Sequence, residues 1–283
     1  MRKASKVFTV LVFCFLYLPM LVLAVASFNR GNDPVVFKGF TLSNYAALFR
    51  DSVLLPLLLN SVIVALISSL MATVLGTAAT LGIQRMRPGL RRFTMALTNI
   101  PLTNPEIVTG VSLALLFAFV GQAMKLKSVM GFWTLLIAHV TFNLPYVILS
   151  VQPKLQQMDE NLTEAALDLG CTPFRAFWKV TLPEILPGIL SGILMSFAMS
   201  LDDFVISYFV YGPNFVTLPV EIYNYTKKPL HPKIYALFTL LFLAILIVMT
   251  VMNLLQARDS AKQRGSRASR RKRAHSESGG NSL

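Results

Sequence analysis

Three acidic side chains of this 283-residue chain stand inside long apolar segments, where a carboxylate is costly unless it faces water or a partner group. Glu106 follows Pro105, and Asp202 and Asp203 are adjacent near the end of a later segment. Acids in such segments commonly mark the path of an ion or a charged solute. We therefore expect these carboxylates to line a path for an organic polycation.

Aromatic residues follow the acid pair along the chain. Tyr208 and Tyr211 could hold ammonium groups over the faces of their rings. Adjacent residues of a helix point about 100° apart, so Asp202 and Asp203 cannot face one path equally. An alternative for Asp202 is that it caps a helix or pairs with another subunit. For the lone His139 we expect packing or hydrogen bonding rather than a proton relay.

These residues must be positioned by membrane-spanning helices. Hydrophobic residues make up 54% of the chain and charged residues 14%, against about 25% charged residues in a soluble domain. Segments of roughly 20 apolar residues are long enough to cross a bilayer. They are approximately Val7–Phe28, Leu54–Ile83, Phe93–Val120, Phe132–Val151, Ile185–Tyr208 and Ile234–Leu255. The sequence predicts an all-α, polytopic transmembrane helical bundle with six spans.

The third and fifth spans hold the acids. The third is interrupted by Pro101 and Pro105, and Glu106 lies about 13 residues, or roughly 20 Å, into it. The acid pair lies near the outer end of the fifth span. We therefore expect Glu106 to stand deep in the membrane, where broken backbone lines a cavity.

The distribution of basic residues predicts the orientation. The net charge is +13, and most of the 26 lysines and arginines fall on one side if both termini are cytoplasmic. The loop from Gln84 to Arg92 is the clearest local example. We expect residues 1–256 to form the membrane domain, with an uncleaved first helix although Ala24–Ala26 resembles a signal-peptidase site. The basic tail, residues 257–283, is predicted to be disordered, either as a topology anchor or as a ligand of anionic lipid.

The connection between the fourth and fifth spans, residues 152–184, has the pattern of two short helices. Asp159 is a candidate N-cap, and Gly170 stands where a glycine would end the first helix. The apolar stripe of that helix is formed by Leu162, Ala165, Ala166 and Leu169. An amphipathic element of this kind binds either a partner protein or the lipid surface, and periodicity leaves both open.

The second short helix begins at a cap followed by proline, Thr172–Pro173, and Pro183 is expected to stop it before the fifth span. Its aromatic face is formed by Phe174, Phe177 and Trp178.

A further set of residues in this connection stands at fixed spacing: Glu164, Ala165, Ala166, Gly170, Val180, Leu182 and Pro183. This set resembles the EAA signature of ABC importer permeases. Isoleucine is commonest in the family where this chain has Val180. The resemblance implies that residues 152–184, the coupling loop, dock in a groove of a cytoplasmic ATPase. It also implies the type I ABC importer permease (MetI-like) fold.

Further stretches are similar to the spermidine/putrescine permeases of that family. They are His-Val-Thr-Phe from His139, Ser-Leu-Asp-Asp-Phe-Val-Ile-Ser from Ser200, Tyr-Gly-Pro from Tyr211 and Thr-Leu-Pro from Thr217. The resemblance implies a permease subunit that carries polyamines across the bacterial cytoplasmic (inner) membrane. The chain departs from the family at Lys233, where an acid is usual, and at Glu106, where aspartate is commoner. A permease for another small cationic solute therefore stays open.

The sequence contains no GxxxxGK[ST] phosphate loop, so ATP must be bound by another polypeptide and no cofactor of the chain itself is expected. Its scattered histidines form no catalytic grouping, which argues against a membrane enzyme. A secondary transporter, the remaining alternative, would be marked by inverted repeats, which we do not find. The resemblance implies these partners: a cytoplasmic ATPase dimer, a second homologous permease, an extracytoplasmic solute-binding protein, the polyamine substrate and the lipid bilayer, without nucleic acid.

Overall fold

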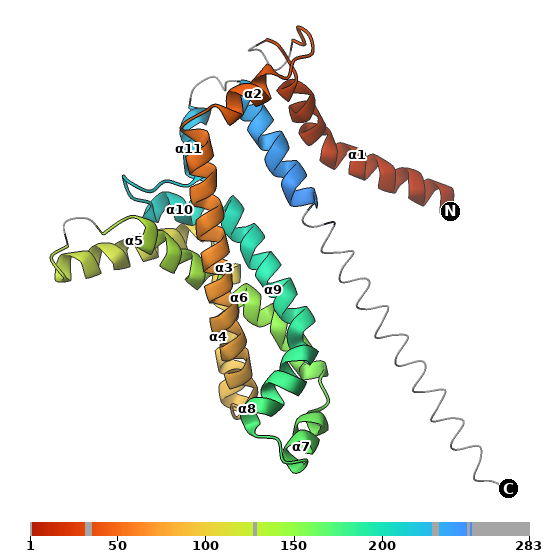
Figure 1. The fold of residues 1–283 in the computed structure, drawn as a ribbon, viewed down its shortest axis with the longest axis vertical. Coiled ribbons are helices and arrows are strands. Elements are labelled where there is room, and N and C mark those ends of the chain that lie inside the picture. The colour runs from red at the N-terminus through yellow and green to blue at the C-terminus, as the bar shows by residue number, and fades with distance from the viewer. Residues whose placement is uncertain (1, 32–35, 127–128, 228–231, 248–249, 251–283) are drawn as a thin grey trace. The chain divides into compact units, whose positions relative to one another are not determined.

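The chain forms two compact units in the computed structural model, which describes residues 2–31, 36–126, 129–227, 232–247 and 250 (Figure 1). The smaller unit comprises residues 1–48 and 231–283, and the larger comprises residues 49–230. The predicted disordered tail lies outside the described residues and stays a prediction.

The elements that the structure describes in both units are helices. The smaller unit holds α1 (Arg2–Ser27), α2 (Ser43–Phe49) and the helix Pro232–Ile247. The larger unit holds α3 (Leu54–Gln84), α4 (Pro88–Thr103), α5 (Glu106–Ala123), α6 (Phe132–Gln157), α7 (Glu160–Asp168), α8 (Pro173–Ala176), the π-helix η1 (Phe177–Thr181), α9 (Leu182–Asp202), α10 (Val205–Val210) and α11 (Leu218–Thr226).

In the smaller unit, a polar corner ties the end of α1 to α2. The Asn44 amide donates to the carbonyl oxygens of Ser27 and Asn29, each at 2.9 Å. The Ser27 and Tyr45 hydroxyls lie 2.7 Å apart. Most side chains of α1 before this corner are exposed and apolar, as a lipid-facing helix requires.

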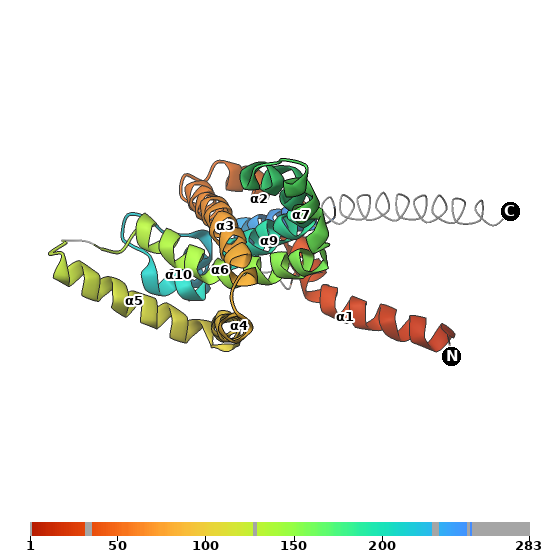
Figure 2. The ribbon, with the colours of Figure 1, turned by 90° about the horizontal axis from the view of Figure 1, so that it is seen from below.

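The core of the larger unit is the three-helix contact of α3, α6 and α9, which lie side by side (Figures 1 and 2). Small residues let these helices approach closely, a common device in membrane helix packing. A Cβ at Gly76 of α3 would lie 2.7 Å from Val147 Cγ1 of α6, and one at Gly188 of α9 would lie 2.9 Å from the Ser150 carbonyl oxygen. The contact provides a rigid base for the sites at both ends of α9.

The interruption predicted in the third span is confirmed at Pro105, where the chain breaks between α4 and α5, whereas Pro101 lies inside α4. Asn104 and Pro105 are extended, with ψ of 138° and 131°. Proline has no N–H to donate and forces the preceding residue out of the helical region, so the break follows from Pro105. Glu106 is consequently the first residue of α5, not a residue about 13 positions into a span.

The fifth predicted span also has different ends. The helix that begins at Pro173 runs through η1 and α9 to Asp202, so Pro183 does not stop it. In η1 the Leu182 N–H bonds the Phe177 carbonyl, five residues back, and this wider turn accommodates the proline in the first turn of α9. Asp203 is extended, and the polypeptide resumes as α10.

The length and apolar composition of the helices support five of the six predicted spans. They are Lys6–Ser27, Leu54–Gln84, Glu106–Ala123, Phe132–Gln157 and Pro173–Asp202. The sixth, predicted at Ile234–Leu255, corresponds to a shorter apolar helix in the described residues, Pro232–Ile247. The remainder of that prediction falls mostly outside them.

Candidate functional site

The coupling loop contains two short helices, α7 and α8, as the sequence predicts. The Asp159 side chain accepts from the Asn161 N–H at 3.1 Å and caps α7. Gly170 follows the end of α7 with φ of 82°, a conformation that favours glycine. Thr172 caps α8, with Pro173 in the first turn. Figure 1 shows α7 and α8 at one end of the larger unit.

Apolar side chains of this loop face outward instead of packing within it. Leu169 is 86% exposed, Phe174 72% and Trp178 53%. The Trp178 ring also contacts the rings of Phe174 and Phe177, with centroids 6.1 and 5.7 Å apart. Ala176 and Thr181, between these exposed rings and α9, are buried. Clustered exposed aromatics of this kind mark a contact surface.

The structure places the signature residues of the loop in two groups. Glu164, Ala165, Gly170 and Pro183 are exposed, while Ala166, Val180 and Leu182 are half-buried. Of the second group, Leu182 packs against the apolar core that α6 and α9 share.

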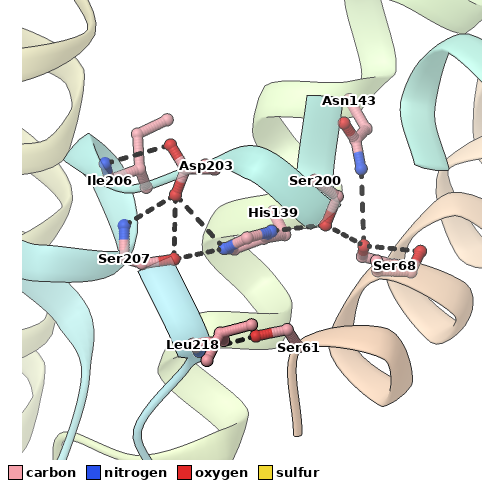
Figure 3. A network of polar contacts seen from close by, with 10 residues as sticks. Ser61, Ser68, His139, Asn143, Ser200, Asp203, Ile206, Ser207 and Leu218 are labelled. Atoms are coloured by element: carbon pink, nitrogen blue, oxygen red, sulfur yellow. Dashed lines mark hydrogen bonds and ion pairs between the residues drawn. The ribbon is translucent and has the colours of Figure 1, made fainter. Parts of the chain in front are cut away.

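At the other end of α9, Asp203 is buried and bonded to the start of α10 (Figure 3). Its carboxylate accepts from the backbone N–H groups of Ile206 and Ser207, at 3.2 and 2.8 Å. It also accepts from the Ser207 hydroxyl at 2.8 Å. The helix-capping role considered for Asp202 thus belongs to its neighbour.

His139 of α6 is 1% exposed and bridges the two sides of this break. Its Nδ1 lies 2.5 Å from Ser200 Oγ of α9, and its Nε2 lies 2.9 Å from Ser207 Oγ of α10. The same Nε2 is 3.5 Å from Asp203 Oδ2. These contacts agree with the hydrogen-bonding role predicted for the histidine.

Asp202 and Glu106, in contrast to Asp203, are exposed. Glu106 is the first residue of α5, and the two aspartates lie just before α10, so the acids come from two distant parts of the chain. Their elements meet where α5 packs on α10, since a Cβ at Gly110 would lie only 2.8 Å from the Phe209 ring. Asp202 and Glu106 thus form an exposed acidic site at the α9–α10 break, with Asp203 beneath it.

An aromatic cluster adjoins α10. The Tyr208 ring lies 5.4 Å from Phe204, 6.2 Å from Tyr211 and 5.7 Å from Tyr223, centroid to centroid. The Lys227 ammonium sits 4.9 Å from the centroid of the Tyr223 ring. One ring of the cluster already holds an alkylammonium group of the chain itself, which is the contact predicted for a cationic solute.

Sequence reasoning missed Tyr223, Phe204 and the serines that bond His139. Ser200 lies three residues before Asp203 and Ser207 four after it, a spacing that places all three near one point if the helix bends there. That spacing was a readable signal. No such signal indicates that Tyr223 approaches Tyr208, because this contact depends on how α11 folds back toward α10.

Comparisons with known proteins agree with this geometry. A family model described as "Binding-protein-dependent transport system inner membrane component" matches residues 73–261. The putrescine transport system permease protein PotI of Escherichia coli K12 is 38% identical over 231 residues, covering 81% of this chain and 82% of that protein. The spermidine/putrescine transport system permease protein PotC of the same strain is 34% identical over 234 residues, covering 83% and 86%.

Solved structures share the fold at lower identity. A chain of a bacterial ABC transporter involved in the import of the acidic polysaccharide alginate aligns with a TM-score of 0.66 at 13% identity, covering 89% of this chain and 96% of that one. A chain of the inward-facing MetNI methionine ABC transporter aligns with a TM-score of 0.55 at 19% identity, covering 72% and 93%. These likenesses confirm the predicted fold class. Because cargoes as different as alginate and methionine accompany it, the fold alone does not select the substrate.

Proposed function

Because the chain belongs to the family of binding-protein-dependent transport system inner membrane components, we propose that it is the permease subunit of an ATP-driven importer of polyamines. The observation that carries the proposal is the helix from Pro173 to Asp202. It joins an exposed aromatic coupling surface at one end to an exposed acidic site at the other.

At the coupling end, we propose that the loop docks on a cytoplasmic ATPase. Phe174 and Trp178 would enter its groove, and Glu164, Ala165 and Gly170 would shape the contact. ATP would be bound and hydrolysed by an ATPase dimer, and this chain would carry no cofactor of its own. A second homologous permease and an extracytoplasmic binding protein would complete the importer.

At the acidic end, Asp202 and Glu106 would bind the ammonium groups of the substrate, with Tyr208 and Tyr211 beside them. A polyamine fits this arrangement because it carries several positive charges on a flexible apolar chain. The named substrates of the relatives, putrescine and spermidine, have this chemistry. Asp203 would not bind the substrate but would fix the start of α10 through its hydrogen bonds to Ile206 and Ser207.

The mechanism that follows is alternating access. The helix from Pro173 to Asp202 has 30 residues, a length of roughly 45 Å at the helical rise. Closure of the ATPase would shift the coupling loop, and this rod would transmit the shift to the acidic site. The coupling loop and both termini would lie in the cytoplasm, and residues 1–256 would form the membrane domain in the inner membrane.

Co-purification with the ATPase tests the proposal. Gly170→Ala places a Cβ on a residue with φ of 82°, although no atom stands within 4 Å of it. Gly89→Ala is the matched control, since its site is equally open and its φ is ordinary. We expect ATPase recovery to fall about tenfold for Gly170→Ala, because the left-handed conformation costs about 1–2 kcal/mol with a side chain. Equal recovery in both variants would contradict the coupling role.

A further inference from the structure

A buried chain of hydrogen bonds crosses the larger unit from α3 to α10 (Figure 3). We call it the polar relay. Its members are Asn143, Ser68, Ser200, His139, Ser207 and Asp203, all of them buried. Such a set is costly unless its groups satisfy one another, so the direction of each bond matters.

The direction is fixed from the Asp203 end. As a carboxylate, Asp203 can only accept hydrogen bonds. The Ser207 hydroxyl therefore donates its single proton to Asp203 Oδ2, at 2.8 Å. Ser207 Oγ must then accept from the imidazole. A neutral His139 ring would therefore carry its proton on Nε2, 2.9 Å from Ser207 Oγ.

The remaining bonds follow in the same sense. With Nε2 protonated, Nδ1 of neutral His139 accepts, and the Ser200 hydroxyl donates to it at 2.5 Å. Ser200 Oγ accepts from the Ser68 hydroxyl at 3.0 Å, and Ser68 Oγ accepts from the Asn143 amide at 3.4 Å. Along these six residues each bond is donated toward Asp203, although the Ser68 hydroxyl, which has one proton, also lies 3.3 Å from the Ala65 carbonyl oxygen of its own helix. The Asn143 Oδ1 atom, at the far end, has no partner within the described part of the chain.

His139 occupies the central place in this chain because it bonds both sides of the α9–α10 break. Ser200 belongs to the last turn of α9, and Ser207 to the first turn of α10. The far end of α10 is held separately, since the Thr134 hydroxyl donates to the Val210 carbonyl at 2.8 Å. The imidazole thus hydrogen-bonds the start of α10 to the three-helix core, beside the apolar contact that buried Ile206 makes with α6.

We propose that His139 is a positioning residue for transport. It fixes the start of α10 relative to α9, and thereby sets the places of Asp202 and Tyr208 beside the path. The transport part of this inference rests on the proposed function. The positioning part rests on the relay alone and is tested separately.

Hydrogen exchange of the full-length chain in lipid nanodiscs tests the positioning. His139→Ala removes both bonds across the break, so we expect residues 203–211 to exchange about tenfold faster, while peptides of α3 and α6 change less than about twofold. Thr141→Ala is the control, because Thr141 is an exposed residue of the same helix that bonds only locally. Unchanged exchange at 203–211, or an equal rise in α3 and α6, would overturn the proposal.

Two further variants keep the test decisive. His139→Gln retains an N–H donor near the position of Nε2, and we expect it to restore most of the protection at 203–211. Ser200→Ala removes only the hydroxyl that bonds His139 Nδ1. This variant tests the positioning role if His139→Ala does not fold. We expect a local rise of about threefold, and no local rise in that variant would overturn the proposal.

Polyamine uptake by the complete transporter tests the transport role. We expect His139→Ala to raise KM about tenfold with a smaller change in maximal rate, and His139→Gln to restore KM in part. A local rise in exchange without any change in uptake would overturn the role in transport. If the proposed substrate path itself is wrong, a different result is expected: Asp202→Asn would then leave uptake unchanged.

Discussion

The two ends of the helix from Pro173 to Asp202 are built in opposite ways. At the coupling loop, apolar and aromatic side chains are exposed, and polar backbone groups are satisfied by local caps. At the α9–α10 break, polar side chains are buried and bonded to residues of other helices. The first end leaves apolar side chains unburied, whereas the polar groups of the second are largely satisfied within the chain.

Because of this difference, substitutions at the two ends should affect different properties, namely binding of the ATPase and stability of the fold. A change at the coupling loop should weaken association with the ATPase and leave the fold intact. A change in the polar relay should weaken the fold or move α10. The exposed acids Asp202 and Glu106 lie beside the relay but should behave like the coupling loop, because the proposed function gives them a ligand to bind and no structural contact to hold.

The largest effect is expected at Asp203. Asp203→Ala leaves the N–H groups of Ile206 and Ser207 and the Ser207 hydroxyl without their acceptor. We expect a loss of about 3 kcal/mol in the free energy of unfolding, because buried donors left unpaired cost 1–3 kcal/mol each. Thermal unfolding of the purified chain in detergent measures it. An unchanged melting temperature would contradict the buried relay.

The aromatic coupling surface should give the next largest effect. Phe174→Ala and Trp178→Ala should each weaken ATPase binding by about 2 kcal/mol, roughly thirtyfold, as interface aromatics do. The free energy of unfolding should change by less than about 0.5 kcal/mol, because both rings are exposed. Titration of the ATPase against the reconstituted chain measures binding. Phe93→Ala, an exposed phenylalanine of α4, serves as the control.

A smaller effect is expected for the exposed acids. Asp202→Asn and Glu106→Gln should each lower polyamine uptake about tenfold, or ~1.4 kcal/mol. Their melting temperatures should stay within a degree or two of the parent chain, unlike that of Asp203→Ala. Normal uptake in a fully assembled double variant would remove these acids from the path.

The smallest effect is expected at the α7 cap. Asp159→Ala removes the bond to the Asn161 N–H and should destabilise α7 by about 1 kcal/mol. Because α7 is short and local, we expect faster hydrogen exchange in residues 160–168 and unchanged exchange at the α9–α10 break. A change at both ends would mean that the two regions are coupled even without the ATPase.

The same contrast explains what the sequence could predict. Caps, glycine ends and proline starts are decided by neighbouring residues, so Asp159, Gly170 and Thr172 were assigned correctly. Long apolar runs likewise revealed the spans. The break at Pro105 was visible, but its effect on the depth of Glu106 was not, since that depends on where α5 starts.

Tertiary contacts account for most of what sequence reasoning missed. The bonds from His139 to Ser200 and Ser207 join residues more than sixty positions apart, so the spacing of the serines around Asp203 could indicate a shared bonding point but not the histidine that bonds there. Pro183 was misread because a π-turn, which has no simple sequence signature, lets the helix continue through it. The sequence predicts that the side chains of Asp202 and Asp203 point in different directions, but only the fold shows that Asp203 is the buried one.

Energy coupling is tested most directly by the ATP dependence of putrescine uptake in vesicles that hold the complete transporter. We predict uptake that requires ATP on the side of the coupling loop and falls at least tenfold in the Phe174→Ala, Trp178→Ala double variant. The variant should keep the melting temperature of the parent chain. Uptake that continues without ATP, driven by an ion gradient and unaffected by that variant, would contradict the account.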